Sequence, residues 1–591
     1  MAEEEKKEKK KRLRAEKKKE NGFVKQLQIA YRSIEDRKKF YRSTMFPLIG
    51  LGILVMMLPF IVGIISPVSL GFNPITFIIG GVVPIILAVL FPYVKWKSKE
   101  SEINGKIHFF ITHLRVLAIS DLSLKDIINV LAGNKAYGAL GEEIRKISVL
   151  SDQWRLPLAK SFVFVSQRTP SKIFRDFLDR FSQSLVSGVD HREFIETEQG
   201  AVLEEYKTIY EASNENITIL NEVYVSLLIA IIFIMTLGIV LPMIMGANDM
   251  NMFIFLSSFL LIVSEALLLY LISSMVPKDE VWHLTGEQGD MELKLKKMFR
   301  NSVVLCIAIG AVLGLGKFYL QLPIINMFSL EMIIAIALTP LFFPGLKALR
   351  IEGEITRKEK NFLGFLPALG SIATMRGGKI NESVYYLSEK DYGVLSQHIK
   401  DLYRRLRTRI NDDDSWEWFG IDTGSNYIQR SSEMFRQATA ASANPRDVSR
   451  MISENVRKIK DLRVKKYSVI HTSAALFAGI TFAIVFSVFT ALVISRHLND
   501  LLIESTAGNP FESAQLDIGA ILSTIPPQAY VYSFSIIFIV FVIHCFMLAY
   551  TIRNLRGSHK LVTLAYFIPY VWVVAVTAFG VDNVLTKALG I

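Results

Sequence analysis

Long apolar runs divide this sequence into segments that can cross a membrane and segments that cannot. Each run holds about 18 to 25 residues with few charges, which is enough for a helix to cross a hydrocarbon layer of roughly 30 Å. Helices are expected because a lipid-exposed backbone must satisfy its own hydrogen bonds, and the runs are too long for barrel strands. We count nine runs, at about 46–66, 74–94, 223–246, 252–275, 302–321, 329–347, 468–495, 530–551 and 561–581.

The order of apolar and polar segments occurs twice, at a separation of about 255 residues. Five residues that share one helical face in the first occurrence are matched by apolar residues 255 positions later, at helical spacing. These sets are Ile107, Phe110, Ile111, Leu114 and Leu117, and Phe362, Phe365, Leu366, Leu369 and Ile372. Further on, Tyr137-Gly138 recurs as Tyr392-Gly393. A repeat of this length indicates a duplicated domain rather than a solenoid of short units.

The charged residues are separated from the apolar runs, and their placement predicts an orientation. The chain of 591 residues is 51% hydrophobic with a mean hydropathy of +0.34, yet 21% of it is charged. Lys95, Lys97 and Lys99 follow the second run, whereas the short loops 67–73 and 247–251 contain no Lys or Arg. Short cytoplasmic loops carry the excess of basic residues, so we expect the N-terminus and both large polar blocks in the cytoplasm and the C-terminus outside.

The expected fold class is all-α, a polytopic membrane protein with about nine transmembrane helices and two cytoplasmic helix bundles. The expected segments are a basic cytoplasmic tail (1–45), helices 1–2 (46–94), a first cytoplasmic domain (95–222), helices 3–4 (223–275), a cytoplasmic connector (276–301), helices 5–6 (302–347), a second cytoplasmic domain (348–467), helix 7 (468–495), an extracellular loop (496–529) and helices 8–9 with the C-terminus (530–591).

The polar blocks contain the signals of short helices. Ser120 to Ser123 form a turn and cap before a helix, Thr169-Pro170-Ser171 opens another, and Gly188 precedes a charged helix that runs into the third span. In the second block Gly377-Gly378 is the corresponding break. The stretch 411–426 is rich in Asp, Asn, Ser and Gly, and we expect a polar loop there.

The first 39 residues are dominated by Lys, Arg and Glu and cannot bury enough apolar surface to fold alone. Two interpretations remain open for this tail. It is either solvated, or it contacts anionic lipid headgroups or an acidic partner through its basic residues.

The sequence contains no motif of a known catalytic site. Gly314-Leu315-Gly316-Lys317 lacks the first Gly of a phosphate-binding loop and the Ser or Thr after the Lys, and it lies inside an apolar run. Metalloprotease, paired-Cys and serine-hydrolase motifs do not occur. We therefore expect no enzyme activity, no cofactor, no metal and no nucleic-acid partner.

Two ionisable residues fall inside the apolar runs, Glu265 and His544. Charges in a bilayer are costly, so such residues are candidates for function by default. They form a candidate intramembrane polar site, either on an ion path or hydrogen-bonded between packed helices. No cluster of polar residues lies beside the prolines of the apolar runs. This absence disfavours a transporter.

The pattern as a whole resembles a known family. Membrane pairs that each lead into a helical polar block, with a turn before a short helix at Ser120 to Ala132 and at Gly377 to Leu387, are similar to the tandem type II secretion system F domains of membrane platform proteins. The length, the basic tail and the nine runs most resemble the archaellum branch of that family.

The resemblance implies a non-enzymatic platform in an archaeal cell membrane. Such a platform binds a hexameric cytoplasmic secretion ATPase and moves pilin-like subunits, the archaellins, into a growing and rotating filament. By analogy it would be a homodimer in contact with membrane lipid. The alternatives are a platform for an adhesive pilus, an ion-coupled transporter or channel, and a receptor with cytoplasmic signalling modules.

Residues for docking an ATPase are expected among charged positions near turns of the polar blocks. For each of them, a solvated helix face is the alternative interpretation. The candidates are Asp126, Glu142, Glu143, Arg145, Lys379, Glu382, Lys400, Asp412, Asp413 and Asp414.

Overall fold

The structure is a computed structural model of the chain. The chain divides into two compact units, Met1–Ser101 with Gln167–Lys172, and Glu102–Ser166 with Ile173–Ile591. The candidate functional site lies in the second unit. The described residues are 31, 40–47, 49–50, 52–53, 56–57, 74–245, 250–277, 279–283, 289–321, 323–408, 411–508 and 527–589.

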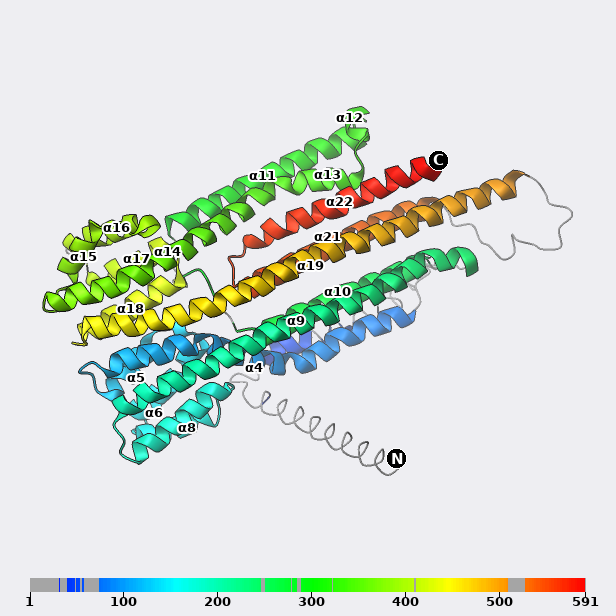
Figure 1. The fold of residues 1–591 in the computed structure, drawn as a ribbon. Coiled ribbons are helices and arrows are strands. Elements are labelled where there is room, and N and C mark those ends of the chain that lie inside the picture. Colours follow the sequence, from blue (N-terminus) through cyan, green and yellow to red (C-terminus); the bar gives the residue numbers. More distant parts are fainter. Residues whose placement is uncertain are drawn as a thin grey trace, which may run out of the picture. The chain divides into compact units, whose positions relative to one another are not determined.

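Within these residues every regular element is a helix, and the only extended contact is an isolated antiparallel bridge between Trp282 and Ser425. The same order of helices occurs twice (Figure 1). The first series is α4 (Pro74–Ala118), α5 (Leu124–Gly133), η2 (Lys135–Tyr137), α6 (Ala139–Asp152), α7 (Leu158–Ser166), α8 (Lys172–Val186) and α9 (His191–Met245). The second is α14 (Phe342–Met375), α15 (Ile380–Ser388), η4 (Gly393–Leu395), α16 (Ser396–Arg407), α17 (Asp412–Thr423), α18 (Asn426–Ala440) and α19 (Pro445–Gly508).

Equivalent residues make equivalent contacts in the two series. The ring of Phe110 meets that of Tyr137 edge-on at 6.3 Å, and the ring of Phe365 meets that of Tyr392 edge-on at 5.5 Å. The glycine after each tyrosine has a positive φ, +52° at Gly138 and +57° in the second series. A residue with a Cβ adopts this backbone region only at a cost, so the Tyr-Gly pair repeated in the sequence marks a repeated turn.

The stretch 411–426 is not the polar loop that the sequence predicts, and that prediction was wrong. Residues Asp412–Thr423 form α17, and the side chain of Asn411 caps it by accepting a hydrogen bond from the amide of Asp413 at 3.1 Å. Three aspartates in the first turn lie favourably against the positive end of the helix dipole. Trp416 and Phe419 bury the inner face. Only Gly424 and Ser425, between α17 and α18, form a turn.

Seven helices of the described residues are long and apolar enough to cross a membrane. They coincide with the last seven predicted runs, and the total number of spans stays a prediction. The run at 46–66 lies largely outside the described residues, and residues 74–94 are helical as part of α4. The elements are α9, α10 (Met250–Met275), α11 (Asp290–Phe318), α13 (Leu330–Leu338) continued through η3 (Thr339–Leu341) into α14, then α19, α21 (Pro527–Arg556) and α22 (Val562–Leu589).

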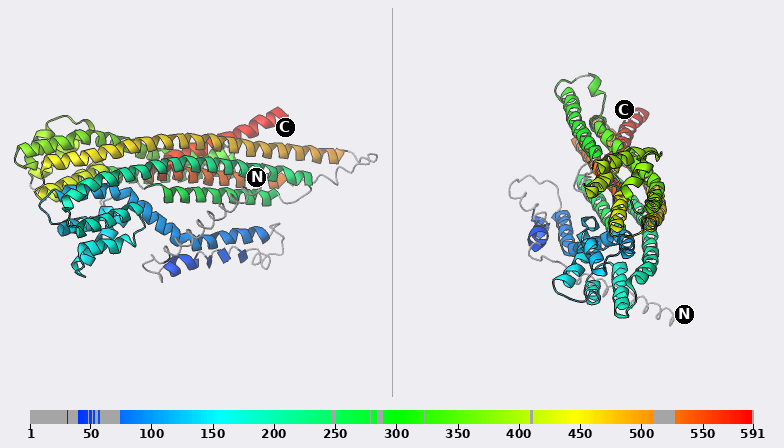
Figure 2. Two further views of the ribbon diagram at one scale, coloured as in Figure 1. Left: turned by 60° about the horizontal axis from the view of Figure 1, so that its bottom comes forward. Right: turned by 90° about the vertical axis from the view of Figure 1, so that its left-hand side faces the viewer.

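Two of these helices, α9 and α19, begin in the polar blocks and continue through the apolar region without a break. They pack against each other, and Figures 1 and 2 show them side by side over much of their length. The helix α19 also extends beyond the predicted end of its span at residue 495, to Gly508. Short α12 (Pro323–Asn326) lies between α11 and α13.

Two large apolar cores follow from this packing. One joins the polar blocks of both series, and its largest fully buried side chains include Phe110, Phe177, Phe365 and Phe435. The other lies among α9, α10, α19, α21 and α22. Because both series contribute to each core, the two halves of the second unit are packed as one body.

Candidate functional site

A cluster of buried charges lies where the chain leaves α10 and enters its second half. The guanidinium of Arg463, on α19, donates two hydrogen bonds to the carboxylate of Asp279, at 2.8 Å from Nε and 2.6 Å from Nη2. Its Nη1 donates to Glu359 of α14 at 3.3 Å. Arg463 thus links the segment after α10 to two helices of the second series, α14 and α19.

Aromatic and hydroxyl side chains surround this charge cluster. The guanidinium lies 4.2 Å from the ring centre of Tyr427, and Tyr210 of α9 donates to Asp279 at 3.4 Å. The hydroxyl of Ser425 donates to Glu359 at 2.6 Å. The three charged residues are at most 8% exposed, and Lys466, over the Tyr210 ring, is 2% exposed. The positive charges of Arg463 and Lys466 balance the negative charges of Asp279 and Glu359, as burial of charged groups requires.

The pKa values reflect burial opposed by these partners. Burial would raise the pKa of Asp279, but the charge and hydrogen bonds of Arg463 outweigh it and lower this pKa to about 2. Burial raises the pKa of Glu359, against the effect of Arg463, and lowers the pKa of Lys466 to about 8. Burial also lowers the pKa of nearby His108 to about 3, so this imidazole is neutral at pH 7.

Residues 279–283 are held from two further sides. The carboxylate of Glu352 on α14 accepts hydrogen bonds from Trp282 Nε1 at 3.0 Å, from Ser558 Oγ at 2.8 Å and from the amide of His559 at 2.9 Å. The Val281 amide donates to the Gly557 carbonyl at 3.3 Å. The connector is therefore clamped against the turn between α21 and α22.

Residues 279–283 also contact the turn between α17 and α18. The amide of Asn426 donates to the Val281 carbonyl at 3.1 Å, and the amide of His283 donates to the Gly424 carbonyl at 3.1 Å. Helices α9, α14 and α19 and two turns thus meet at a connector of a few residues. We call residues 279–283 with Arg463, Glu359 and Glu352 the connector clamp.

The connector clamp joins the segment after α10 to α14, to α19 and to the turn between α21 and α22. Its charges are paired and closed to solvent, and removing one partner would leave an uncompensated buried charge, which costs about 3 to 5 kcal/mol. Within the described ranges no group of three His, Cys, Asp or Glu side chains could hold a metal ion.

The candidate intramembrane residues meet in the structure. The ring Nδ1 of His544 on α21 contacts Glu265 Oε1 on α10, and Tyr224 of α9 donates to the same oxygen at 3.3 Å. Thr481 of α19 lies 3.2 Å from His544 Nε2. Glu265 is 1% exposed and His544 is fully buried. Four helices of the apolar core therefore share one polar cluster.

The candidate docking residues lie on two groups of helices, one in each series. Asp126 is exposed and is bonded by the Ser123 hydroxyl, whereas Glu143 is only 2% exposed and pairs with Lys146. Glu142 and Arg145 are exposed on α6. On the second series Lys379 pairs with Glu382 at 3.1 Å, Asp413 pairs with Arg436, and Lys400, Asp412 and Asp414 are exposed. These two groups lie on different helices, α5 and α6 against α15 to α17.

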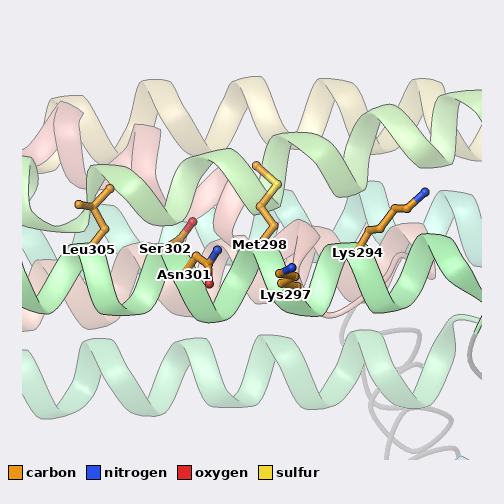
Figure 3. Close-up of a pocket in the computed structure, with 6 residues that line it drawn as sticks. All are labelled: Lys294, Lys297, Met298, Asn301, Ser302 and Leu305. Atoms are coloured by element: carbon orange, nitrogen blue, oxygen red, sulfur yellow. The ribbon is translucent and has the colours of Figure 1, made fainter.

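A pocket of about 370 Å³ is lined by one face of α11, where Lys294 and Lys297 lie beside Met298 (Figure 3). The remaining lining residues are Asn301, Ser302 and Leu305, all from the same helix. This is a groove on the surface of a single helix, and it brings together no acid and base.

The connector clamp is not predicted by the sequence. Arg463 and Lys466 stand just before an apolar run, where basic residues are ordinary markers of the cytoplasmic side. Their acidic partner Asp279 lies 184 residues away from Arg463 along the chain. A single sequence contains no periodicity that links such positions.

Comparison with known proteins agrees with this architecture. Residues 110–241 match the family model of type II secretion system protein F. The chain is 33% identical over 549 residues to flagella accessory protein J of Methanococcus voltae, covering 90% of this chain and 96% of the relative. It is 31% identical to flagella accessory protein J of Methanocaldococcus jannaschii over 549 residues, covering 91% and 96%. No solved structure matches the chain.

Both similarities cover about nine-tenths of the chain, at 90% and 91%. The seven long apolar helices are what a multi-pass membrane protein requires. The chain is therefore a multi-pass membrane protein that belongs to the flagella accessory protein J family.

Proposed function

We propose that this protein is the membrane platform of archaellum assembly, and that it couples a cytoplasmic hexameric secretion ATPase to the insertion of pilin-like subunits into the filament. The similarity to two flagella accessory proteins and to type II secretion system protein F supports the archaellum over an adhesive pilus. The protein would act without chemistry of its own, as a non-catalytic partner of the ATPase.

The connector clamp is the observation that carries this proposal. A platform must move its membrane helices when a soluble motor moves its cytoplasmic blocks. The helices α9 and α19 have 55 and 64 residues, so at 1.5 Å per residue they are rods of about 80 and 95 Å. Arg463 ties one rod to the connector, and Tyr210 ties the other to the same carboxylate. A displacement of either block is thereby passed to both rods.

The orientation and the segments predicted from sequence belong to this proposal. The blocks 95–222 and 348–467 face the cytoplasm and receive the ATPase, and the apolar helices meet lipid and the pilin-like subunits. Two platform copies would act together as a homodimer under a hexameric motor. We place the ATPase contact on the exposed charges of α15 to α17, where Lys379, Lys400 and Asp412 are open to solvent.

The proposal can be tested by binding of the purified full-length platform, in lipid nanodiscs, to the archaellum ATPase from the same cell. Charge reversal by Lys379→Glu with Lys400→Glu should weaken binding at least about tenfold. The matched control is Lys458→Glu, an exposed position on α19 away from the turns. If the wild-type platform does not bind the ATPase, and proteoliposomes instead conduct an ion in a way that Glu265→Gln abolishes, the platform proposal is wrong.

A strain without this gene separates the two filament types. Loss of archaella with adhesive pili retained is expected. Loss of adhesive pili alone would assign the platform to the other filament.

A further inference from the structure

The contact between Glu265 and His544 raises the question of how many protons the pair holds. Both side chains are at most 1% exposed and lie in the apolar core of α9, α10, α19 and α21. Neither a lone carboxylate nor a lone imidazolium is tolerated cheaply in such surroundings.

Hydrogen-bond accounting places donors on the imidazole. The hydroxyl of Thr481 lies 2.7 Å from the carbonyl of Phe477, one turn earlier in α19, and donates its single proton there. Its oxygen can then only accept from His544 Nε2, which must carry a proton. The second ring nitrogen, Nδ1, faces Glu265 Oε1. Two lone pairs would repel at that contact, so one further proton lies between these atoms.

The opposite arrangement would leave a net negative charge. If Thr481 donated to the imidazole, a neutral ring could still donate to an ionised Glu265. The carboxylate would then be compensated only by Tyr224, because Glu265 Oε2 accepts no hydrogen bond from the described residues. The other titratable groups beside the pair, Cys545 on α21 and beyond it Tyr570 on α22, supply no positive charge. The neutral, protonated pair is favoured.

We propose that Glu265 and His544 form a one-proton binding site inside the membrane-spanning bundle, and that separating α10 from α21 releases this proton. The proposal does not depend on the ATPase. We call the protonated pair of Glu265 and His544, which holds α10 against α21, the latch. The helix α10 leads into the connector clamp at Asp279.

The latch has a defined pH dependence. In the closed state the pair holds one proton, and in the open state, where both groups meet water, this proton can dissociate. Opening and proton release are therefore linked. Opening becomes more favourable as the pH rises, by at most about tenfold for each pH unit.

Cys545 is a natural reporter of this opening. It is fully buried beside His544, and Cys306 is the other cysteine of the chain. In a Cys306→Ser background, the full-length protein in nanodiscs is treated with N-ethylmaleimide between pH 5.5 and 9. Each labelling rate is divided by the rate of the denatured protein at the same pH, which removes the titration of the thiol itself.

The ratio of folded to denatured rates should rise with pH, by up to about tenfold per pH unit. Glu265→Gln should remove this rise, because no proton is then shared between the two side chains. His544→Gln should instead lower the pH at which the rise begins, because the buried carboxyl then holds the proton alone. Glu331→Gln, at a buried carboxyl on α13 without a histidine contact, should retain the wild-type slope.

A wild-type ratio that does not change with pH would overturn the proposal. The same conclusion follows if Glu265→Gln keeps the full slope. Should Glu265→Gln fail to fold, the onset in His544→Gln decides, and an onset at the same pH as in the wild type contradicts a shared proton.

Discussion

The two helical series differ in one respect that matters more than their similarities. Both contain the same turn and the same edge-on pair of rings, Phe110 with Tyr137 and Phe365 with Tyr392. The charged helix residues of the connector clamp, Arg463, Glu359 and Glu352, however, come from the second series. The helix α19 begins 254 residues after α9, so the position equivalent to Arg463 holds Ile209, and the position 255 residues before Glu359 holds Asn104; neither residue is charged. Duplication thus supplied two bundles, and only one of them became the anchor of the connector.

The tips of the bundles differ as well. In the first series the turn after α4 is covered, since Ser120 is 1% exposed and the amide of Asp121 donates to the Ala441 carbonyl at 3.2 Å. In the second series Met375, at the equivalent turn, is 78% exposed. The second bundle therefore has both the internal anchor and the more open turn, which is why we propose that the ATPase contacts this bundle.

The largest expected effect is the loss of the charge at the centre of the clamp. Arg463→Met leaves Asp279 and Glu359 buried without their counter-ion and should lower the free energy of unfolding by about 3 to 5 kcal/mol. A control change in the first series, Thr208→Met on an exposed face of α9, should cost less than about 0.5 kcal/mol. Denaturant unfolding in detergent compares them. Equal losses would mean that the two series are energetically alike.

The turn between α21 and α22 should be the next most sensitive position. Gly557 has a φ of +65°, and a Cβ there would lie 1.9 Å from the Asp279 carbonyl oxygen. Gly557→Ala should cost roughly 2 to 4 kcal/mol through strain and displacement of the connector. Gly364→Ala, in the middle of α14 with open space around it, should be neutral or stabilising. A harmless Gly557→Ala would show that the connector is not fixed at this turn.

The acid stability of the clamp follows from Asp279. Its pKa of about 2 in the folded protein lies below the ordinary value of 3.8, so its contribution is present above pH 3.8 and is lost as the pH falls toward 2. The amount is about 2 kcal/mol. Glu359, whose pKa is raised, opposes this in part. The measured quantity is the difference between wild type and Asp279→Asn from pH 5 to pH 2, which should shrink. A constant difference would contradict an ionised, paired Asp279.

A smaller asymmetry is expected at the repeated tyrosines. The Tyr137 hydroxyl lies 2.9 Å from His113 Nδ1, whereas the residue equivalent to that histidine is Ala368. Tyr137→Phe should therefore cost about 1 kcal/mol and Tyr392→Phe close to zero. Thermal melts of the two variants measure this difference, and a larger loss from Tyr392→Phe would reverse the comparison.

Local signals made most of the helices predictable, and long-range pairing made the site unpredictable. The Thr169-Pro170-Ser171 and Gly188 signals lie at the starts of α8 and α9 as expected. The failure at 411–426 was avoidable, because Asn411 followed by three aspartates is a cap signal. Glu265 and His544 were identified from their place in apolar runs, but no local pattern joins positions 279 residues apart. The same holds for Asp279 and Arg463.

The central claim is that the connector clamp passes motion from the cytoplasmic blocks to the membrane helices. Arg463→Lys tests it most directly, because lysine keeps the positive charge but cannot form the two-pronged hydrogen bond to Asp279. The variant is introduced into the native cells, and filaments are counted alongside ATPase binding by the purified full-length platform. We predict a folded platform that binds the ATPase normally while the cells assemble few or no filaments. Normal filament numbers with normal binding would contradict the account.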